Sequence, residues 1–151
     1  MEISQVRNMS IILAGFILVA VFGLTACNPE MLHAKAPVRI KDPWLRWDAD
    51  TNTGELYFYL SNTSAVDDAL LEAQSEAATE VDIYSAPPGS SITDIEKVSM
   101  IELPLEKSII LLPGGPHIKL LGMRDVTPGQ LIPITLRFEH AGEFSFFVEA
   151  R

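Results

Sequence analysis

Apolar and polar residues alternate along several short stretches of the chain after residue 37. Successive side chains of a β-strand point to opposite faces, so this alternation predicts half-buried strands. Turns rich in Gly, Pro, Asn and Ser separate the stretches, which are residues 38–42, 55–60, 69–73, 78–85, 95–103, 108–112, 118–121, 132–138 and 144–149. Eight or nine short strands with frequent turns predict an all-β sandwich with Greek-key connections.

Residues 67–80 carry two conflicting patterns. The segment ALLEAQSEAATE is rich in Ala, Leu and Glu, which have high helix propensity. Thr79, Val81 and Ile83 instead alternate with acidic and polar neighbours, as in a strand. We predict a strand near 69–73, a turn and a second strand over 78–85. The family resemblance described below supports this choice more than propensity does.

The N-terminal segment has the organisation of a secretory signal. Arg7 precedes an apolar run over 11–26, and the run ends in small residues. Its last residues, LTAC at 24–27, resemble a bacterial lipobox. The resemblance implies that a lipoprotein signal peptide, residues 1–26, is removed and that Cys27 carries the lipid anchor. The alternative is an uncleaved membrane helix, but the run is shorter than the roughly 20 residues that such a helix needs.

Residues 27–37 are expected to form a lipidated tether between the membrane and a domain at 38–151. Met31 and His33 in the tether either hold a soft metal ion or are simply exposed. Asn28 follows the lipobox cysteine, where an Asp would suggest retention at the inner membrane. We therefore expect an extracytoplasmic, membrane-anchored lipoprotein on the periplasm side, with the outer membrane favoured.

Charge and cysteine content narrow the functional classes. The formal net charge is −9, and eleven acids with no Lys or Arg lie between Trp47 and Glu96. This balance argues against nucleic acid and anionic membrane surfaces as partners. It indicates either a solvated acidic face or a mild attraction for cations. The single cysteine excludes an intramolecular disulfide and a thiolate metal cluster.

The stretch LLPGGPHIKLLGM, at 111–123, organises the rest of the domain. Prolines cannot donate to a strand ladder and glycines tolerate positive φ, so PGGP at 113–116 predicts a turn between two strands. The turn places His117 at the start of a strand, where β-sandwiches usually carry their sites.

With IELP at 101–104 and LRFEHAGEF at 136–144, this turn resembles the periplasmic copper chaperone family PCu(A)C. The resemblance covers nearly all of 38–151 and implies a cupredoxin-like sandwich. In that family the turn reads PGG-x-H-x-M. Its Cu(I) site consists of a His at the end of a central strand, a Met in the following loop and the His-x-Met pair. Cu(I) is a soft ion that prefers thioether and imidazole ligands.

One of these four ligand positions keeps its residue here. His117 matches, whereas Tyr84 stands at the position of the first His and Lys119 at that of the last Met. A phenol is a poor Cu(I) ligand, and an ammonium has no lone pair. The loop Met should fall near Ile95, so Met100 is the nearest substitute. The resemblance therefore implies a degenerate copper site.

Two functions remain open from the sequence. The first is a lipid-anchored copper chaperone-like protein in which Cu(I) binding, by His117 and Met100, and delivery are weakened or lost. Its partner would be a protein such as a respiratory oxidase assembly factor. The second is a lipoprotein interaction module without metal, in which Tyr84, His117 and Lys119 form a polar patch. No enzyme motif is present in the sequence, so we do not expect an enzyme.

Overall fold

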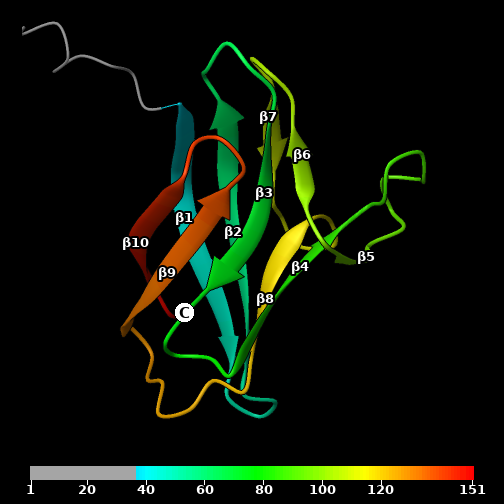
Figure 1. The fold of residues 1–151 in the computed structure, drawn as a ribbon. Helices are drawn as coiled ribbons and strands as arrows, with labels where there is room; N and C mark the ends of the chain where they lie inside the picture. Colours follow the sequence, from blue (N-terminus) through cyan, green and yellow to red (C-terminus); the bar gives the residue numbers. More distant parts are fainter. Residues whose placement is uncertain (1–36) are drawn as a thin grey trace, which may run out of the picture. The chain divides into compact units, whose positions relative to one another are not determined.

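The computed structural model describes residues 37–151, which form two antiparallel sheets packed face to face (Figure 1). The six-stranded sheet has the order β1-β2-β8-β4-β5, with β7 also paired to β2, and the four-stranded sheet has the order β10-β9-β3-β6. The strands are β1 Val38–Asp48, β2 Thr53–Asn62, β3 Asp68–Gln74, β4 Glu80–Ser85, β5 Glu96–Val98, β6 Ile101–Leu103, β7 Ser108–Ile110, β8 His117–Leu121, β9 Leu131–Phe138 and β10 Glu143–Glu149. Within this range, no helix is long and apolar enough to cross a membrane.

The predicted all-β sandwich is confirmed, because the chain passes repeatedly from one sheet to the other. The ambiguous segment at 67–80 forms strand, turn and strand, as predicted. Its first half is β3 of the four-stranded sheet, and its second half leads into β4 of the six-stranded sheet. Burial of Leu70 and Ile83 in the core outweighs the helix propensity of the segment.

Two predicted strands differ most from the structure. The single strand expected over 95–103 is two strands, β5 and β6, because the chain crosses between the sheets at Ser99 and Met100. The strand expected over 38–42 continues to Asp48 through a bulge between Lys41 and Trp44. Pro43 is tolerated there because β1 lies at the edge of its sheet, where a missing N–H costs little.

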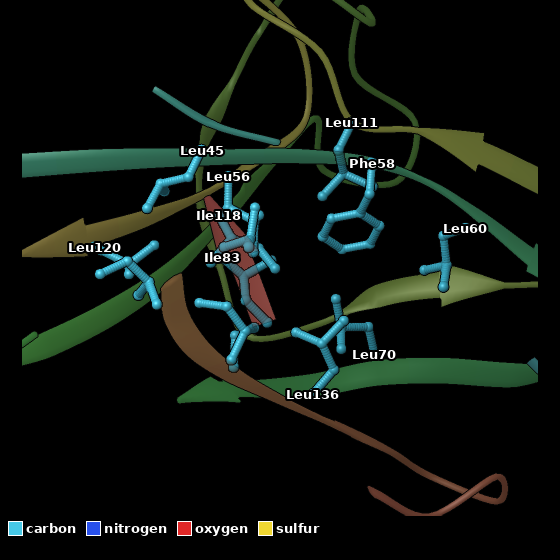
Figure 2. Packing of buried hydrophobic residues seen from close by; sticks show 14 of the residues in the cluster. Leu45, Leu56, Phe58, Leu60, Leu70, Ile83, Leu111, Ile118, Leu120 and Leu136 are labelled. Carbon is cyan, nitrogen blue, oxygen red and sulfur yellow. The ribbon is translucent and has the colours of Figure 1, made fainter. Parts of the chain in front are cut away.

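The hydrophobic core lies between the two sheets and receives side chains from both (Figure 2). Leu56, Phe58, Ile118 and Leu136 are among its buried members. Burying one such side chain contributes about 1.5–3 kcal/mol. The buried core cluster lies within residues 38–150, so the sandwich has a core of its own.

Met123 belongs to this core, with 1% of its surface exposed. A Cβ on Gly54 would lie 2.6 Å from the Met123 sulfur. Close packing therefore favours glycine at this second position of β2. Met123 therefore fills space in the core.

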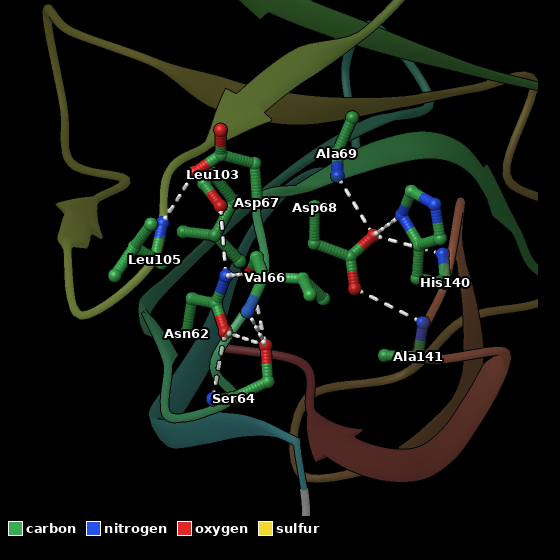
Figure 3. A network of polar contacts seen from close by, with 10 residues as sticks. All are labelled: Asn62, Ser64, Val66, Asp67, Asp68, Ala69, Leu103, Leu105, His140 and Ala141. Atoms are coloured by element: carbon green, nitrogen blue, oxygen red, sulfur yellow. Dashed lines mark hydrogen bonds and ion pairs between the residues drawn. The ribbon is translucent and has the colours of Figure 1, made fainter.

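Buried polar side chains tie the β2–β3 connection to two distant parts of the chain (Figure 3). The Asp68 carboxylate accepts hydrogen bonds from the backbone N–H groups of Ala69, His140 and Ala141, at 2.8, 3.0 and 3.0 Å. Asn62 donates to the Leu103 carbonyl oxygen at 3.0 Å, which links β2 to β6. Asp68 and Asn62 therefore hold together the end of the sandwich at which β2 ends and β3 begins.

The signal peptide at 1–26, the lipidation of Cys27, and Met31 and His33 of the tether lie outside the described residues. The proposed domain boundary at 38 coincides with the start of β1.

Candidate functional site on the outer face of the six-stranded sheet

The PGGP turn joins β7 to β8, and both strands pair with β2. Gly114 has φ +79°, a conformation that glycine adopts without strain. The N–H of Leu112 donates to the Pro116 carbonyl at 2.9 Å, and the N–H of Gly115 donates to the Leu112 carbonyl at 3.0 Å. The predicted turn is confirmed, and it delivers His117 as the first residue of β8, the central strand of its sheet.

His117 is held by the turn that precedes it. Its Nδ1 lies 2.8 Å from the carbonyl oxygen of Gly115. A carbonyl oxygen can only accept, so Nδ1 carries the proton and donates it. In the neutral imidazole, Nε2 is then the nitrogen with a free lone pair. A backbone carbonyl on the other ring nitrogen is the usual arrangement for a histidine that ligates a metal.

An aromatic row crosses the outer face of the sheet at the level of His117. Tyr84 is its cross-strand partner on β4, and the two rings are stacked with centroids 5.0 Å apart and planes 3° apart. The Tyr57 ring on β2 lies 6.3 Å from His117 on the other side, and Trp44 on β1 lies 4.4 Å from Tyr57. The imidazole is therefore enclosed by aromatic rings from both neighbouring strands.

A row of alternating charges lies next to the aromatic row. Arg46, Glu55, Lys119 and Asp82 are successive cross-strand partners on β1, β2, β8 and β4. Arg46 pairs with Glu55. Asp82 pairs with Lys97 on β5 at 2.6 Å, which is the main cause of the raised pKa of Lys97. Opposite charges on facing strands stabilise the register of the sheet.

Glu55 connects the two rows. It accepts hydrogen bonds from the Tyr57 hydroxyl and from Arg46. Burial alone would raise the pKa of Glu55, but the hydrogen bond from the Tyr57 hydroxyl and the charge of Arg46 outweigh burial and lower the pKa. Burial and the bond to Glu55 together raise the pKa of Tyr57 to about 12. The site therefore contains an ionised Glu55 and a neutral Tyr57 over the physiological pH range.

Lys119 lies above the ring of Tyr84, with its Nζ 6.0 Å from the ring centroid. This distance is typical of a cation–π contact. Among the described residues, Lys119 forms no ion pair within 4.0 Å. Its ammonium therefore has no direct ion-pair partner in this part of the chain, although Glu55 and Asp82 are its cross-strand neighbours.

The structure brings three of the four candidate site residues together and places the fourth elsewhere. Tyr84, His117 and Lys119 are neighbours on β4 and β8, as the alternation of strand side chains predicts. Met100 lies in the turn between β5 and β6, and it lines two cavities that do not include His117. Ile95, at the position of the loop Met, precedes β5. No group of three or more His, Cys, Asp or Glu in residues 37–151 could hold a metal ion.

Tyr57 and Glu55 are site residues that sequence inspection missed. They alternate along ELYFYL, so the pattern placed them on one face but did not identify that face as the one bearing His117. Trp44 and Arg46 had a signal, since an aromatic residue and an Arg after the first strand are part of the PCu(A)C pattern. The cross-strand register then places Glu55 and Tyr57 on the strand next to β8, and Trp44 and Arg46 one strand further away, on β1.

Comparison with known proteins identifies the family of this chain. The sequence profile described as "Putative lipoprotein LpqE-like" matches residues 38–150. "Putative lipoprotein Lxx21020" from Leifsonia xyli subsp. xyli is 27% identical in an alignment 125 residues long, which covers 77% of this chain and 75% of the relative.

Solved structures show the same fold. The copper-bound PCuAC domain from PmoF2 superimposes with a TM-score of 0.65 and is 28% identical, covering 79% of this chain and 97% of that domain. The Cu(I) form of DR1885 from Deinococcus radiodurans has a TM-score of 0.66 at 20% identity, covering 78% of this chain and 81% of that one. The chain therefore belongs to the LpqE-like family, and residues 38–150 form a domain of the PCu(A)C type.

Proposed function

We propose that this protein is a lipid-anchored, extracytoplasmic member of the PCu(A)C type whose affinity for Cu(I) is low and depends on His117. It acts by binding copper and not as an enzyme. The copper passes to a partner protein, such as a respiratory oxidase assembly factor. The anchor is Cys27, in keeping with the lipoprotein names of the family and of the Leifsonia relative.

The observation that carries the proposal is the environment of the His117 imidazole. The Gly115 carbonyl fixes the proton on Nδ1 and leaves Nε2 as a soft donor, which suits Cu(I). The neighbours of this donor do not suit Cu(I): Tyr84 offers a phenol, and Lys119 offers a positive charge. The similar domain from PmoF2 is described as copper-bound. One good donor among poor ones supports weak binding.

The direct test is Cu(I) affinity, measured by competition with a chromogenic chelator on residues 28–151. We expect weak binding by the wild type and at least a tenfold loss in His117→Ala. His140→Ala is the matched control, because His140 lies in the hairpin between β9 and β10 and its side chain is 59% exposed. Met100→Leu tests whether the substitute thioether contributes. Tight wild-type binding, or an equal loss in both histidine variants, would contradict the proposal.

A second candidate function is an interaction module without metal. It is favoured by an exposed apolar pair beside the aromatic row. Tyr59 on β2 and Ile110 on β7 are cross-strand partners with 46% and 43% of their surfaces exposed. Undetectable copper binding by both the wild type and His117→Ala would favour this function.

A further inference from the structure

The outer face of the six-stranded sheet carries a basic patch between the row of His117 and the end where β1 begins. In one row, Lys41, Tyr59 and Ile110 are cross-strand partners on β1, β2 and β7. The adjacent row contains a pair of serine hydroxyls 2.8 Å apart. Partners in register share a face, so both rows lie opposite the buried side chain of Leu60. The members of the basic patch are Arg39, Lys41, Tyr59, Ser61, Ser108 and Ile110.

The patch combines unpaired cations with exposed apolar surface. Arg39 and Lys41 are exposed, and neither forms an ion pair within 4.0 Å in the part of the chain that the structure describes. Tyr59 and Ile110 lie between them and the open side of β7, with 46% and 43% of their surfaces exposed. Tyrosine and long cationic side chains are typical of the membrane interface, where a polar tip meets head groups and an apolar stem stays out of water.

The chain enters the sandwich at the same end as the patch. The N–H of Thr63 donates to the Pro37 carbonyl at 2.8 Å, which fixes the entry beside the end of β2. Cys27 precedes Pro37 by ten residues in the sequence. Ten residues span at most about 35 Å. A bilayer that holds Cys27 is therefore within reach of the patch, and tethering raises the effective concentration so that a weak contact suffices.

From this juxtaposition we infer that the basic patch rests on the phosphate-bearing surface of an anionic bilayer, an inference that builds on the proposed lipid anchor at Cys27. Lipid phosphates accept charge-assisted hydrogen bonds from Arg39 and Lys41. Tyr59 and Ile110 lie at the level of the head groups. The aromatic row of His117 is the next row of the same face, so the contact holds the candidate copper site close to the lipid surface.

The distribution of acids decides how the domain meets the bilayer. A net charge of −9 argues against anionic surfaces for the chain as a whole, but charges more than about 8 Å away are largely screened at physiological ionic strength. Asp42 lies in the bulge of β1 and forms no ion pair with Lys41. Asp67, Glu106 and Glu139 lie in the connections at the end where β1 begins. They oppose a domain that stands upright on these connections and favour one that lies on the basic patch.

The test uses the single cysteine of the chain. Residues 27–151 contain the whole core, and Cys27 is the only residue that a maleimide lipid can couple. The ¹⁵N-labelled protein is coupled to nanodiscs that carry a gadolinium head-group lipid, made of phosphatidylcholine alone or with added phosphatidylglycerol. We expect the amide signals of 39–41, 59–61 and 108–110 to broaden most, and at least threefold more with phosphatidylglycerol. Chemical coupling replaces the natural anchor, so a wrong lipobox assignment leaves this result unchanged.

Charge reversal tests the two cations. Arg39→Glu with Lys41→Glu should reduce the broadening with phosphatidylglycerol to the level seen with phosphatidylcholine alone. Arg124→Glu with Arg137→Glu is the matched control, because it changes the net charge equally at two exposed residues outside the patch. Amide spectra without lipid show that each variant is folded. Unchanged broadening in the first pair, or an equal loss in both pairs, would overturn the inference.

The apolar half of the patch and the alternative occupant are tested separately. Tyr59→Ser with Ile110→Ser should weaken the broadening in both lipid compositions. Soluble polyglutamate, titrated without nanodiscs, represents an acidic protein as the occupant. Shifts of the patch amides by polyglutamate without broadening by nanodiscs would favour such a protein and overturn the inference. Broadening that is strongest at 63–67 and 139–142 would show an upright domain and would overturn it as well.

Discussion

The phenol ring of Tyr84 lies parallel to the imidazole of His117, with the centroids 5.0 Å apart and the planes inclined by only 3°. The two residues are direct cross-strand partners on β4 and β8. The resemblance to the PCu(A)C family aligns Tyr84 with the first histidine of the family's Cu(I) site. The stack therefore places an aromatic ring where the family has a ligand, and it supports His117 without supplying a soft donor.

Restoring the missing donors should restore copper binding. Tyr84→His with Lys119→Met should raise the affinity for Cu(I) by at least about two orders of magnitude, or roughly 2.7 kcal/mol. The change supplies an imidazole and a thioether beside His117 and removes the ammonium. Repulsion between that ammonium and a monovalent ion at about 4 Å costs of order 1 kcal/mol in water and more when partly desolvated.

Competition with a chelator measures this gain in Cu(I) affinity. The two single variants show how much of the gain comes from each position. Tyr84→Phe with Lys119→Leu is the control, because it removes the same groups without adding a soft donor. If the double variant binds no better than this control, then Tyr84 and Lys119 do not face the metal position and the alignment onto the family is wrong.

Tyr57 should make the protein sensitive to alkaline pH. Its pKa is raised to about 12 in the fold, against about 10 in the unfolded chain, so the folded state holds the proton more tightly. This contribution to the free energy of unfolding is complete below pH 10 and is lost as the pH rises through 12. Urea unfolding at pH 9 and 12 should show the difference between wild type and Tyr57→Phe falling by about 2 kcal/mol. A constant difference would mean that burial and the bond to Glu55 do not raise the pKa of Tyr57.

The Asp68 carboxylate should be a major determinant of stability. Asp68→Ala leaves three backbone N–H groups without their acceptor, and we expect a loss of about 3 kcal/mol in the free energy of unfolding. Asp67→Ala is the neighbouring control, because Asp67 accepts a single bond from the exposed N–H of Leu105 and should cost about 1 kcal/mol or less. Chemical denaturation at pH 7 compares the two. Equal losses would show that the network in Figure 3 does not hold the β9–β10 hairpin.

The anchor is tested by removing its attachment atom. Cys27→Ala should prevent lipid attachment to the full chain and should shift the protein out of the detergent-extracted membrane fraction. Several acyl chains, at about 0.8 kcal/mol per buried methylene, account for stable anchoring of the wild type. Fractionation with mass measurement of the N-terminus is the readout. Wild-type protein that is soluble and intact from Met1 would contradict the lipobox assignment.

The sequence by itself determined the class of fold and the position of the key histidine. Alternation of apolar and polar residues is a local property, since it follows from the geometry of each strand. It located most of the strands, and at 67–80, where helix propensity pointed the other way, the resemblance to the PCu(A)C family supported the strand prediction. The PGGP turn likewise follows from the conformations open to proline and glycine, so His117 could be placed at the start of a strand.

Only the tertiary structure decided what surrounds His117 and which side chains share its face. Tyr57 and Glu55 are about 60 residues away in the chain, and the register between β2 and β8 brings them beside the imidazole. Met100 lies in the connection between β5 and β6, where the chain changes sheets, and it lines cavities that do not include His117. Register and sheet order depend on the simultaneous burial of the inner faces of both sheets. No local pattern encodes them, and they appear only when the whole core is assembled.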